Sequence, residues 1–202
     1  VNKHGLEADV LTKSEIERME PDVQYDMTGG VHFGCDAWMT PNVFMGDFQN
    51  RLIEAGVKIQ YNTTVEKIAY QGAKIDNIIT DKGEFKADEY VLAAGSWTPD
   101  LMKQIKIDLP LQGGKGYSFT IPDPVVMPKL PSILAEGKIA TTPMIHGLRF
   151  AGTMEIAGTQ LDINPRRVNG IIKAIKDFMP QFKEQDFSEI KEWAGLRPCT
   201  PD

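Results

Sequence analysis

The 202-residue chain is acidic, with 22 Lys and Arg residues against 28 Asp and Glu residues and a formal net charge of −6 at pH 7. This balance provides no basic surface for nucleic acid, and no apolar run is long enough to cross a bilayer. Two cysteines, Cys35 and Cys199, are too few for a disulfide framework or a cysteine-rich zinc site. We therefore expect a globular cytoplasmic protein of one large or two small domains, with no metal site.

Two helices are predicted in the first quarter of the chain. The segment Thr12-Lys-Ser-Glu15 has the spacing of a capping box, and Pro21 ends the short helix that follows. Residues 22–41 are rich in Gly, Asp and Pro and predict a strand with loops. A second helix is expected to begin at Pro41 and to end at Gly56. Its apolar residues recur at every fourth position and predict one buried face, formed by Phe44, Phe48 and Leu52.

A group of strands is predicted after this helix. Alternating apolar residues indicate strands at Val57–Tyr61, Val65–Ile68, Lys74–Ile79 and Glu84-Phe85, with Asp81-Lys-Gly83 as a hairpin turn. The run Tyr90-Val-Leu-Ala-Ala94 is almost wholly apolar, which is typical of a strand buried on both faces of a parallel sheet.

The second half of the chain predicts an antiparallel sheet with Pro-rich connections. Strand patterns occur at Tyr117–Ile121 and Leu148–Phe150. The Gly-rich segment Gln112-Gly-Gly-Lys-Gly-Tyr117 is interpreted either as a flexible turn or as the aromatic edge of a substrate pocket. Asn164 and Pro165 begin a further helix, which ends before Pro180. Its predicted buried stripe contains Val168, Ile171, Ile172, Ile175 and Met179.

Two short segments have the residue types of a binding site. Ala94 and Gly95 end the apolar run and have little bulk, so the backbone there could approach a ligand closely, although a tight turn without a ligand explains them too. Arg197 lies between Gly195-Leu and Pro198 on a backbone that cannot be helical, and its planar guanidinium suits a carboxylate. A surface or ion-pair role is the alternative for Arg197. The three histidines show no metal-ligand spacing.

Taken in order, these segments resemble the FAD-dependent D-amino-acid oxidase and dehydrogenase family, which includes glycine oxidase and sarcosine oxidase. The resemblance covers essentially the whole chain and is closest to the bacterial D-amino-acid dehydrogenases. The matching segments are Gly56-Val-Lys-Ile59, Thr64-Val-Glu-Lys-Ile68, Ala87–Trp97, Lys115-Gly-Tyr117, Ala151-Gly-Thr-Met-Glu155 and Gly195-Leu-Arg-Pro198.

The resemblance implies roles for individual residues. Arg197 matches the arginine that holds the substrate carboxylate, and Tyr117 lies where the substrate-domain sheet would lean over the flavin. Val65 matches a valine whose backbone meets the adenine end of FAD. Ala94, Gly95 and Trp97 match the stretch that passes close to the flavin nucleotide. The implied reaction is transfer of a hydride from the substrate α-carbon to the flavin, followed by hydrolysis of the imino acid.

The family's Gly-x-Gly-x-x-Gly segment is absent from the 202 residues. We therefore expect an α/β (α+β) internal piece of the enzyme, inactive alone, that combines a slice of the doubly wound FAD-binding domain with a mostly antiparallel substrate domain and flanking helices. The expected boundaries are 1–38 and 102–192 for the substrate domain, 39–101 for the FAD slice, and 193–202 for the return toward the FAD domain.

These expectations extend to cofactors and partners. FAD would belong to the full-length protein and would not be retained by this piece, which we expect to self-associate through exposed apolar surface. The substrate would be a small amino acid, and a peripheral contact with the inner membrane could serve a quinone acceptor. Two alternatives stay open at this point: a glycine- or sarcosine-type amine oxidase of the same family, and a non-catalytic binding module.

Overall fold

A computed structural model describes residue 5 and residues 7–201 of the chain. The mixed class of helices with antiparallel sheets is confirmed, and no helix in the described part of the chain is long and apolar enough to span a membrane. The chain divides into two compact units, whose boundaries fall within one helix, three strands and one loop. Unit 1 comprises Val1–Phe44, Gly116–Met154 and Asp162–Gly195, and unit 2 comprises Met45–Lys115, Glu155–Leu161 and Leu196–Asp202.

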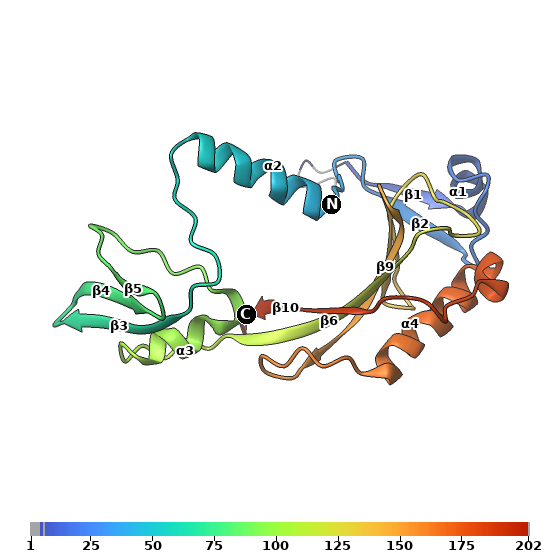
Figure 1. The fold of residues 1–202 in the computed structure, drawn as a ribbon. Helices are drawn as coiled ribbons and strands as arrows, with labels where there is room; N and C mark the ends of the chain where they lie inside the picture. Colours follow the sequence, from blue (N-terminus) through green and yellow to red (C-terminus); the bar gives the residue numbers. More distant parts are fainter. Residues whose placement is uncertain (1–4, 6, 202) are drawn as a thin grey trace. The chain divides into compact units, whose positions relative to one another are not determined.

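The elements follow in chain order (Figure 1). The helices are α1 (Lys13–Met19), α2 (Pro41–Glu54), α3 (Thr98–Lys103) and α4 (Pro165–Phe178), with the 3-10 helices η2 (Gly95–Trp97) and η3 (Pro180–Glu184). The strands are β1 (Asp9–Thr12), β2 (Gly29–His32), β3 (Val65–Gln71), β4 (Lys74–Thr80), β5 (Gly83–Phe85), β6 (Gln112–Ile121), β7 (Ser132–Leu134), β8 (Ile139–Met144), β9 (Gly147–Ile156) and β10 (Trp193–Cys199). They form sheets in the orders β1-β2, β3-β4-β5 and β10-β6-β9-β8-β7.

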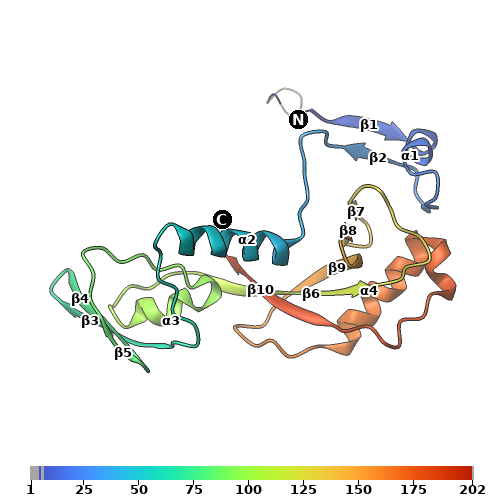
Figure 2. The same ribbon diagram turned by 45° about the horizontal axis from the view of Figure 1, so that its top comes forward.

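The first hairpin of unit 1 carries the predicted helix cap. β1 and β2 pair antiparallel, and α1 follows β1 directly, as the turned view shows (Figure 2). One oxygen of the Glu15 carboxylate accepts hydrogen bonds from the Thr12 backbone N–H at 2.8 Å and from the Thr12 hydroxyl at 2.7 Å. These bonds satisfy a donor at the helix start, so the capping-box prediction is confirmed.

The core of unit 1 lies between the large sheet and α4. Asn164 accepts a hydrogen bond from the Arg166 backbone N–H at 3.1 Å, which confirms the predicted N-cap. The buried face of α4 packs against aromatic side chains of the sheet. The ring of Phe150 lies 5.8 Å from that of Phe119 and 5.4 Å from that of Phe182. Edge-on and tilted ring contacts of this kind add to the free energy gained from burial.

Unit 2 contains the three-stranded sheet β3-β4-β5 and the short helix α3. The strands predicted at Val65–Ile68, Lys74–Ile79 and Glu84-Phe85 are confirmed, with the hairpin turn where the sequence indicates it. The side chain of Gln104, just after α3, joins the helix to β3. It accepts a hydrogen bond from the Ile68 N–H at 3.0 Å and donates one to the Glu66 carbonyl at 3.1 Å.

Two strand predictions in unit 2 are wrong. Val57–Tyr61 and Tyr90–Ala94 form no strand, and the Val91 side chain is 92% exposed. A strand is held by hydrogen bonds to a neighbour, unlike a helix, whose bonds lie within its own segment. Among the described residues neither segment pairs with another strand. The parallel pairing that the apolar run Tyr90–Ala94 predicts is therefore not formed here, and neither is the strand predicted at Val57–Tyr61.

Two further expectations need correction. The Gly-rich segment Gln112–Tyr117 is not a turn, because it belongs to the ten-residue strand β6. A Cβ atom at Gly113 would collide with the Gly158 carbonyl oxygen, so glycine here allows close approach of two backbones. α2 has its predicted bounds, but none of its residues is buried, and Phe44 and Phe48 are half-exposed. The predicted buried face is therefore not observed, because none of the described elements buries the apolar residues of this helix.

Candidate functional site

The predicted site residues fall mainly in unit 2. Arg197, Val65, Ala94, Gly95 and Trp97 all belong to this unit, whereas Tyr117 belongs to unit 1. Three separate stretches of unit 2 therefore carry the predicted cofactor and substrate contacts. Each stretch is considered below with its own neighbours.

Arg197 lies on β10, the edge strand of the five-stranded sheet. Its side chain is exposed, and its guanidinium forms no ion pair with a described carboxylate. Pro198 fixes the backbone on one side, and the Trp193 ring covers the place where a side chain at Gly195 would lie. This arginine therefore presents an unpaired planar donor fork on a stiff strand, which suits a carboxylate ligand.

Gly95 and Ser96 form a small polar feature in η2. Gly95 has φ +54°, in the left-handed region that favours glycine, and a Cβ there would meet no atom within 4 Å. Both explanations that the sequence allowed thus find support: the backbone needs glycine, and the space beside it is open. The Ser96 hydroxyl is buried and has no hydrogen-bond partner among the residues that the structure describes. A buried hydroxyl without a partner costs free energy, so a polar partner here would stabilise the segment.

Trp97 completes this segment, with its side chain 47% exposed. Its backbone N–H donates to the Ala94 carbonyl at 3.1 Å, which closes the tight turn between the apolar run and α3. The turn therefore holds an open glycine, an unpaired hydroxyl and a large exposed aromatic ring within three residues. Ser96 is the residue of this segment to which sequence reasoning assigned no role.

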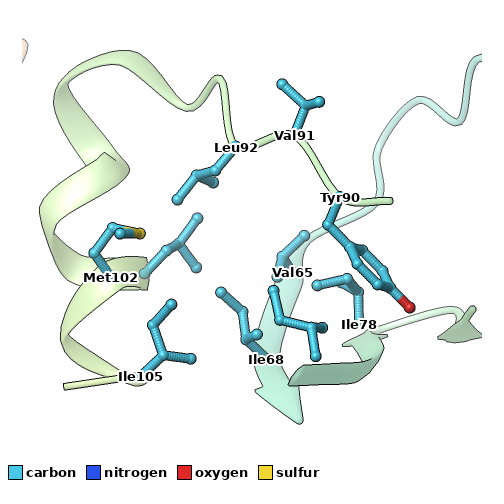
Figure 3. A pocket seen from close by; sticks show the side chains of 10 residues that line it. Val65, Ile68, Ile78, Tyr90, Val91, Leu92, Met102 and Ile105 are labelled. Carbon is cyan, nitrogen blue, oxygen red and sulfur yellow. The ribbon is translucent and has the colours of Figure 1, made fainter. Parts of the chain in front are cut away.

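Val65 lies at the start of β3 and lines an apolar pocket of about 180 Å³ (Figure 3). The pocket lies between β3, β4, α3 and the extended run that begins at Tyr90. Figure 3 shows Leu92 pointing into the pocket and Val91 pointing away from it. Its lining residues are Val65, Ile68, Ile75, Ile78, Tyr90, Val91, Leu92, Leu101, Met102 and Ile105.

This pocket is too small for FAD, and its apolar lining does not suit the charged groups of an amino acid. Pockets that bury a drug-sized ligand measure roughly 300–1,000 Å³ and contain convergent polar groups. The one hydroxyl in the lining, on Tyr90, already bonds the Ala87 N–H and the Asp76 carbonyl, at 3.0 and 3.2 Å. The pocket therefore fits aliphatic side chains rather than the cofactor.

Tyr117 has a different setting from the one expected. Its side chain is 2% exposed and belongs to the hydrophobic core of unit 1, together with Phe119 and Ile121 of the same strand. In the structure it is a core residue, and its role above the flavin stays a prediction.

Lys115, two residues earlier, forms a buried ion pair in unit 2. Its Nζ atom lies 3.0 Å from a carboxylate oxygen of Glu155, and the Lys115 and Glu155 side chains are 5% and 17% exposed. The sequence marked Lys115 and Glu155 as parts of two motifs but did not predict their pairing, because it does not give the register between β6 and β9. In the described residues no group of His, Cys, Asp and Glu could hold a metal ion.

The comparisons with known proteins agree on one family. The model described as "DAO: FAD dependent oxidoreductase" matches residues 1–202. A D-amino acid dehydrogenase of Vibrio atlanticus is 37% identical over 203 residues, which is 99% of this chain and 48% of that protein. The D-amino acid dehydrogenase of Rhodopseudomonas palustris is 32% identical over 207 residues, with 100% and 48% covered. The chain thus spans about half the length of these relatives.

Solved structures support the fold. Glycine oxidase from Geobacillus kaustophilus superimposes with a TM-score of 0.87 at 20% identity, covering 100% of this chain and 54% of that one. L-proline dehydrogenase from P. horikoshii gives a TM-score of 0.82 at 22% identity, with 100% and 55% covered. At these identities the likeness establishes the fold and not the substrate.

Proposed function

This chain belongs to the DAO family of FAD-dependent oxidoreductases, and we propose that it forms part of an enzyme that oxidises D-amino acids to imino acids. The observation that carries this proposal is Arg197, an exposed guanidinium without a described carboxylate partner on an edge strand. Identity of 32–37% to proteins named D-amino acid dehydrogenase supports the choice of substrate class.

The residues of η2 fit a bound flavin nucleotide. The open space at Gly95 would admit the cofactor close to the backbone, and the Ser96 hydroxyl would gain a partner. We propose that Val65, Ala94, Gly95 and Trp97 contact FAD, and that residues 39–101 and 193–202 lie on its side of the enzyme. Residues 1–38 and 102–192 would then face the substrate. FAD, when bound, supplies the two-electron oxidation, which no side chain can perform.

The chain's own contribution to the reaction is orientation. Arg197 would hold the substrate carboxylate through two parallel N–H donors, so the carboxylate could not rotate and the α-carbon would be held in one position. The proposal also places Tyr117 where the substrate-domain sheet would lie over the flavin. Since the relatives are named dehydrogenases, the proposal includes a membrane quinone as acceptor and a peripheral contact with the membrane.

Replacing Arg197 with leucine in the intact enzyme tests the proposal. Removing one partner of a charged, hydrogen-bonded pair costs roughly 2–5 kcal/mol. We therefore expect kcat/KM for D-alanine, measured with a soluble quinone analogue, to fall at least about thirtyfold. Arg166→Leu, at an exposed position of α4, is the control and should leave kcat/KM unchanged. Wild-type kcat/KM in Arg197→Leu would overturn the assignment. If the intact wild-type enzyme were more active on glycine or sarcosine than on D-alanine, the substrate class would be that of a glycine- or sarcosine-type oxidase.

The chain by itself should bind FAD weakly. Its 202 residues contain no Gly-x-Gly-x-x-Gly segment to receive the pyrophosphate, and the contacts proposed above reach only parts of the cofactor. We expect calorimetric titration with FAD to show no saturation below about 100 μM, and light scattering to show association through exposed residues such as Val91. Stoichiometric binding at micromolar FAD would show that the cofactor site is complete within this chain.

A further inference from the structure

Arg149 lies on β9, between two residues that belong to the hydrophobic core of unit 1. Its neighbours Leu148 and Phe150 are fully buried, and Phe150 packs against Phe119 and Phe182. Side chains alternate along a strand, so Arg149 points to the opposite face. Thr142 is its register partner on β8 and therefore lies on this face too. We call this the open face of the sheet.

The Arg149 guanidinium is held by two contacts. Its Nη2 atom donates to the Ser118 hydroxyl at 3.2 Å, and its central carbon lies 5.9 Å from the centre of the Trp193 ring. Ser118 lies on β6 and Trp193 on β10, so three strands fix the position of one side chain. The cation–π contact with the indole and the bond to one hydroxyl leave most of the five guanidinium N–H donors without a partner among the described residues.

No carboxylate of the described residues pairs with this guanidinium. The contrast with Lys115 is informative, because that buried cation has Glu155 at 3.0 Å. Arg149 is only partly exposed, in a chain of net charge −6, and its hydrogen-bond partner Ser118 and register partner Thr142 are both neutral. A partly desolvated cation with a fixed plane and free donors attracts an anion, and a carboxylate matches its planar geometry.

We propose that Arg149, Ser118 and Trp193 form a carboxylate-binding site on the open face of the sheet. Arg149 supplies paired N–H donors, Ser118 sets the plane of the guanidinium, and Trp193 shields one side of it from water. The identity of the ligand rests on the proposed function, which makes it an amino acid. Its carboxylate has two possible sources: the α-carboxylate of any amino acid, or the side-chain carboxylate of an acidic one.

Calorimetric titration of the 202-residue chain, without turnover, tests this site. The probes are D-glutamate and D-glutamine, which differ only in the side-chain carboxylate. The titrations use an Arg197→Leu background, so that the arginine proposed to hold the substrate does not contribute. We expect Arg149→Leu to weaken D-glutamate binding at least about tenfold, the usual effect of losing a charged hydrogen-bonded contact. Arg166→Leu, the matched surface control, should change nothing.

Comparing D-glutamate with D-glutamine shows whether the α-carboxylate or the side-chain carboxylate binds at Arg149. Loss of affinity for D-glutamate alone identifies the side-chain carboxylate, whereas equal loss for both ligands identifies the α-carboxylate. Unchanged affinity for both ligands, or no binding by the Arg197→Leu chain at all, would overturn the proposal. The indole N–H resonance of Trp193, assigned with Trp193→Phe, should shift on binding and report where the ligand lies.

Two further variants guard against misfolding. Arg149→Lys keeps the charge but loses the paired donors, and it should retain part of the affinity. Ser118→Ala should keep the fold and weaken binding less than Arg149→Leu does. These titrations involve no flavin chemistry, so they test the binding site separately from the proposed function. Carboxylate binding without D-amino-acid oxidation would contradict only the proposed function, and oxidation without this binding would contradict only the carboxylate site.

Discussion

The two units of the chain differ in how far they bury their apolar residues. In unit 1 the large side chains of Phe150, Phe182 and Met179 are completely buried between the sheet and α4. In unit 2 the apolar run before Gly95 is extended and open, with Val91 92% exposed, and an apolar pocket lies beside it. Both units expose some apolar side chains, such as Ile133 in unit 1. Unit 1 also has a closed core, whereas Ile68 is the only buried hydrophobic residue among the described residues of unit 2.

The difference teaches how far a local apolar pattern can be trusted. The stripe on α4 and the run at Tyr90–Ala94 are equally clear in the sequence. The stripe is buried because a sheet of the same unit lies against it. The run stays exposed because none of the described strands pairs with it. An apolar segment gains free energy from burial, but whether it is buried depends on the elements that pack against it.

The largest expected effect comes from truncating the core of unit 1. Phe150→Ala removes a buried ring with two aromatic neighbours and should lower the free energy of unfolding of the chain by about 3–5 kcal/mol. Val91→Ser, at the most exposed apolar position of the open run, should change it by less than about 0.5 kcal/mol. Urea denaturation followed by circular dichroism measures both, and equal losses would break the comparison between the units.

Gly95→Ala, in unit 2, should lower the free energy of unfolding by an intermediate amount. Because φ is +54° and the space is open, alanine should cost about 1–2 kcal/mol through backbone strain alone. Gly72→Ala is the matched control, with φ +61° and no atom within 4 Å. Both variants should destabilise the chain similarly in thermal unfolding.

Flavin retention separates the two glycine variants. In the intact enzyme only Gly95→Ala should release FAD, measured as the flavin absorbance that stays with the protein after gel filtration. If both variants retained FAD equally, Gly95 would serve the backbone turn and not the cofactor.

The smallest expected effect concerns the pH dependence of α1. Hydrogen bonds from the Thr12 side chain and backbone lower the pKa of the Glu15 carboxyl below its ordinary value. The stabilisation that these bonds provide is therefore present above the ordinary pKa of glutamate and is lost as the pH falls through the lowered one. We expect the amide signals of Thr12 and Glu15 to report fraying of the helix start in that acidic range. Thr12→Val, which lacks the hydroxyl, should fray at higher pH.

Sequence reasoning located part of the candidate site. Arg197 was found because Gly-Leu-Arg-Pro restricts its own backbone, and Gly95 because a glycine after an apolar run is visible locally. Arg149 was missed as a site residue, since a single arginine inside a strand carries no local signal of its partners. Ser118 and Trp193 approach it from strands 31 and 44 residues away in sequence, and only the sheet order brings them together.

The sequence by itself determined what local bonds and local sterics control. The cap at Thr12–Glu15, the start of α2 at Pro41 and the bounds and buried stripe of α4 follow from hydrogen bonds and contacts within a few residues. The tertiary structure decided everything that needs a distant partner. It placed Tyr117 in a core, paired Lys115 with Glu155 and left Tyr90–Ala94 without a neighbouring strand. Strand pairing and burial join residues far apart in the chain, so no local pattern contains them.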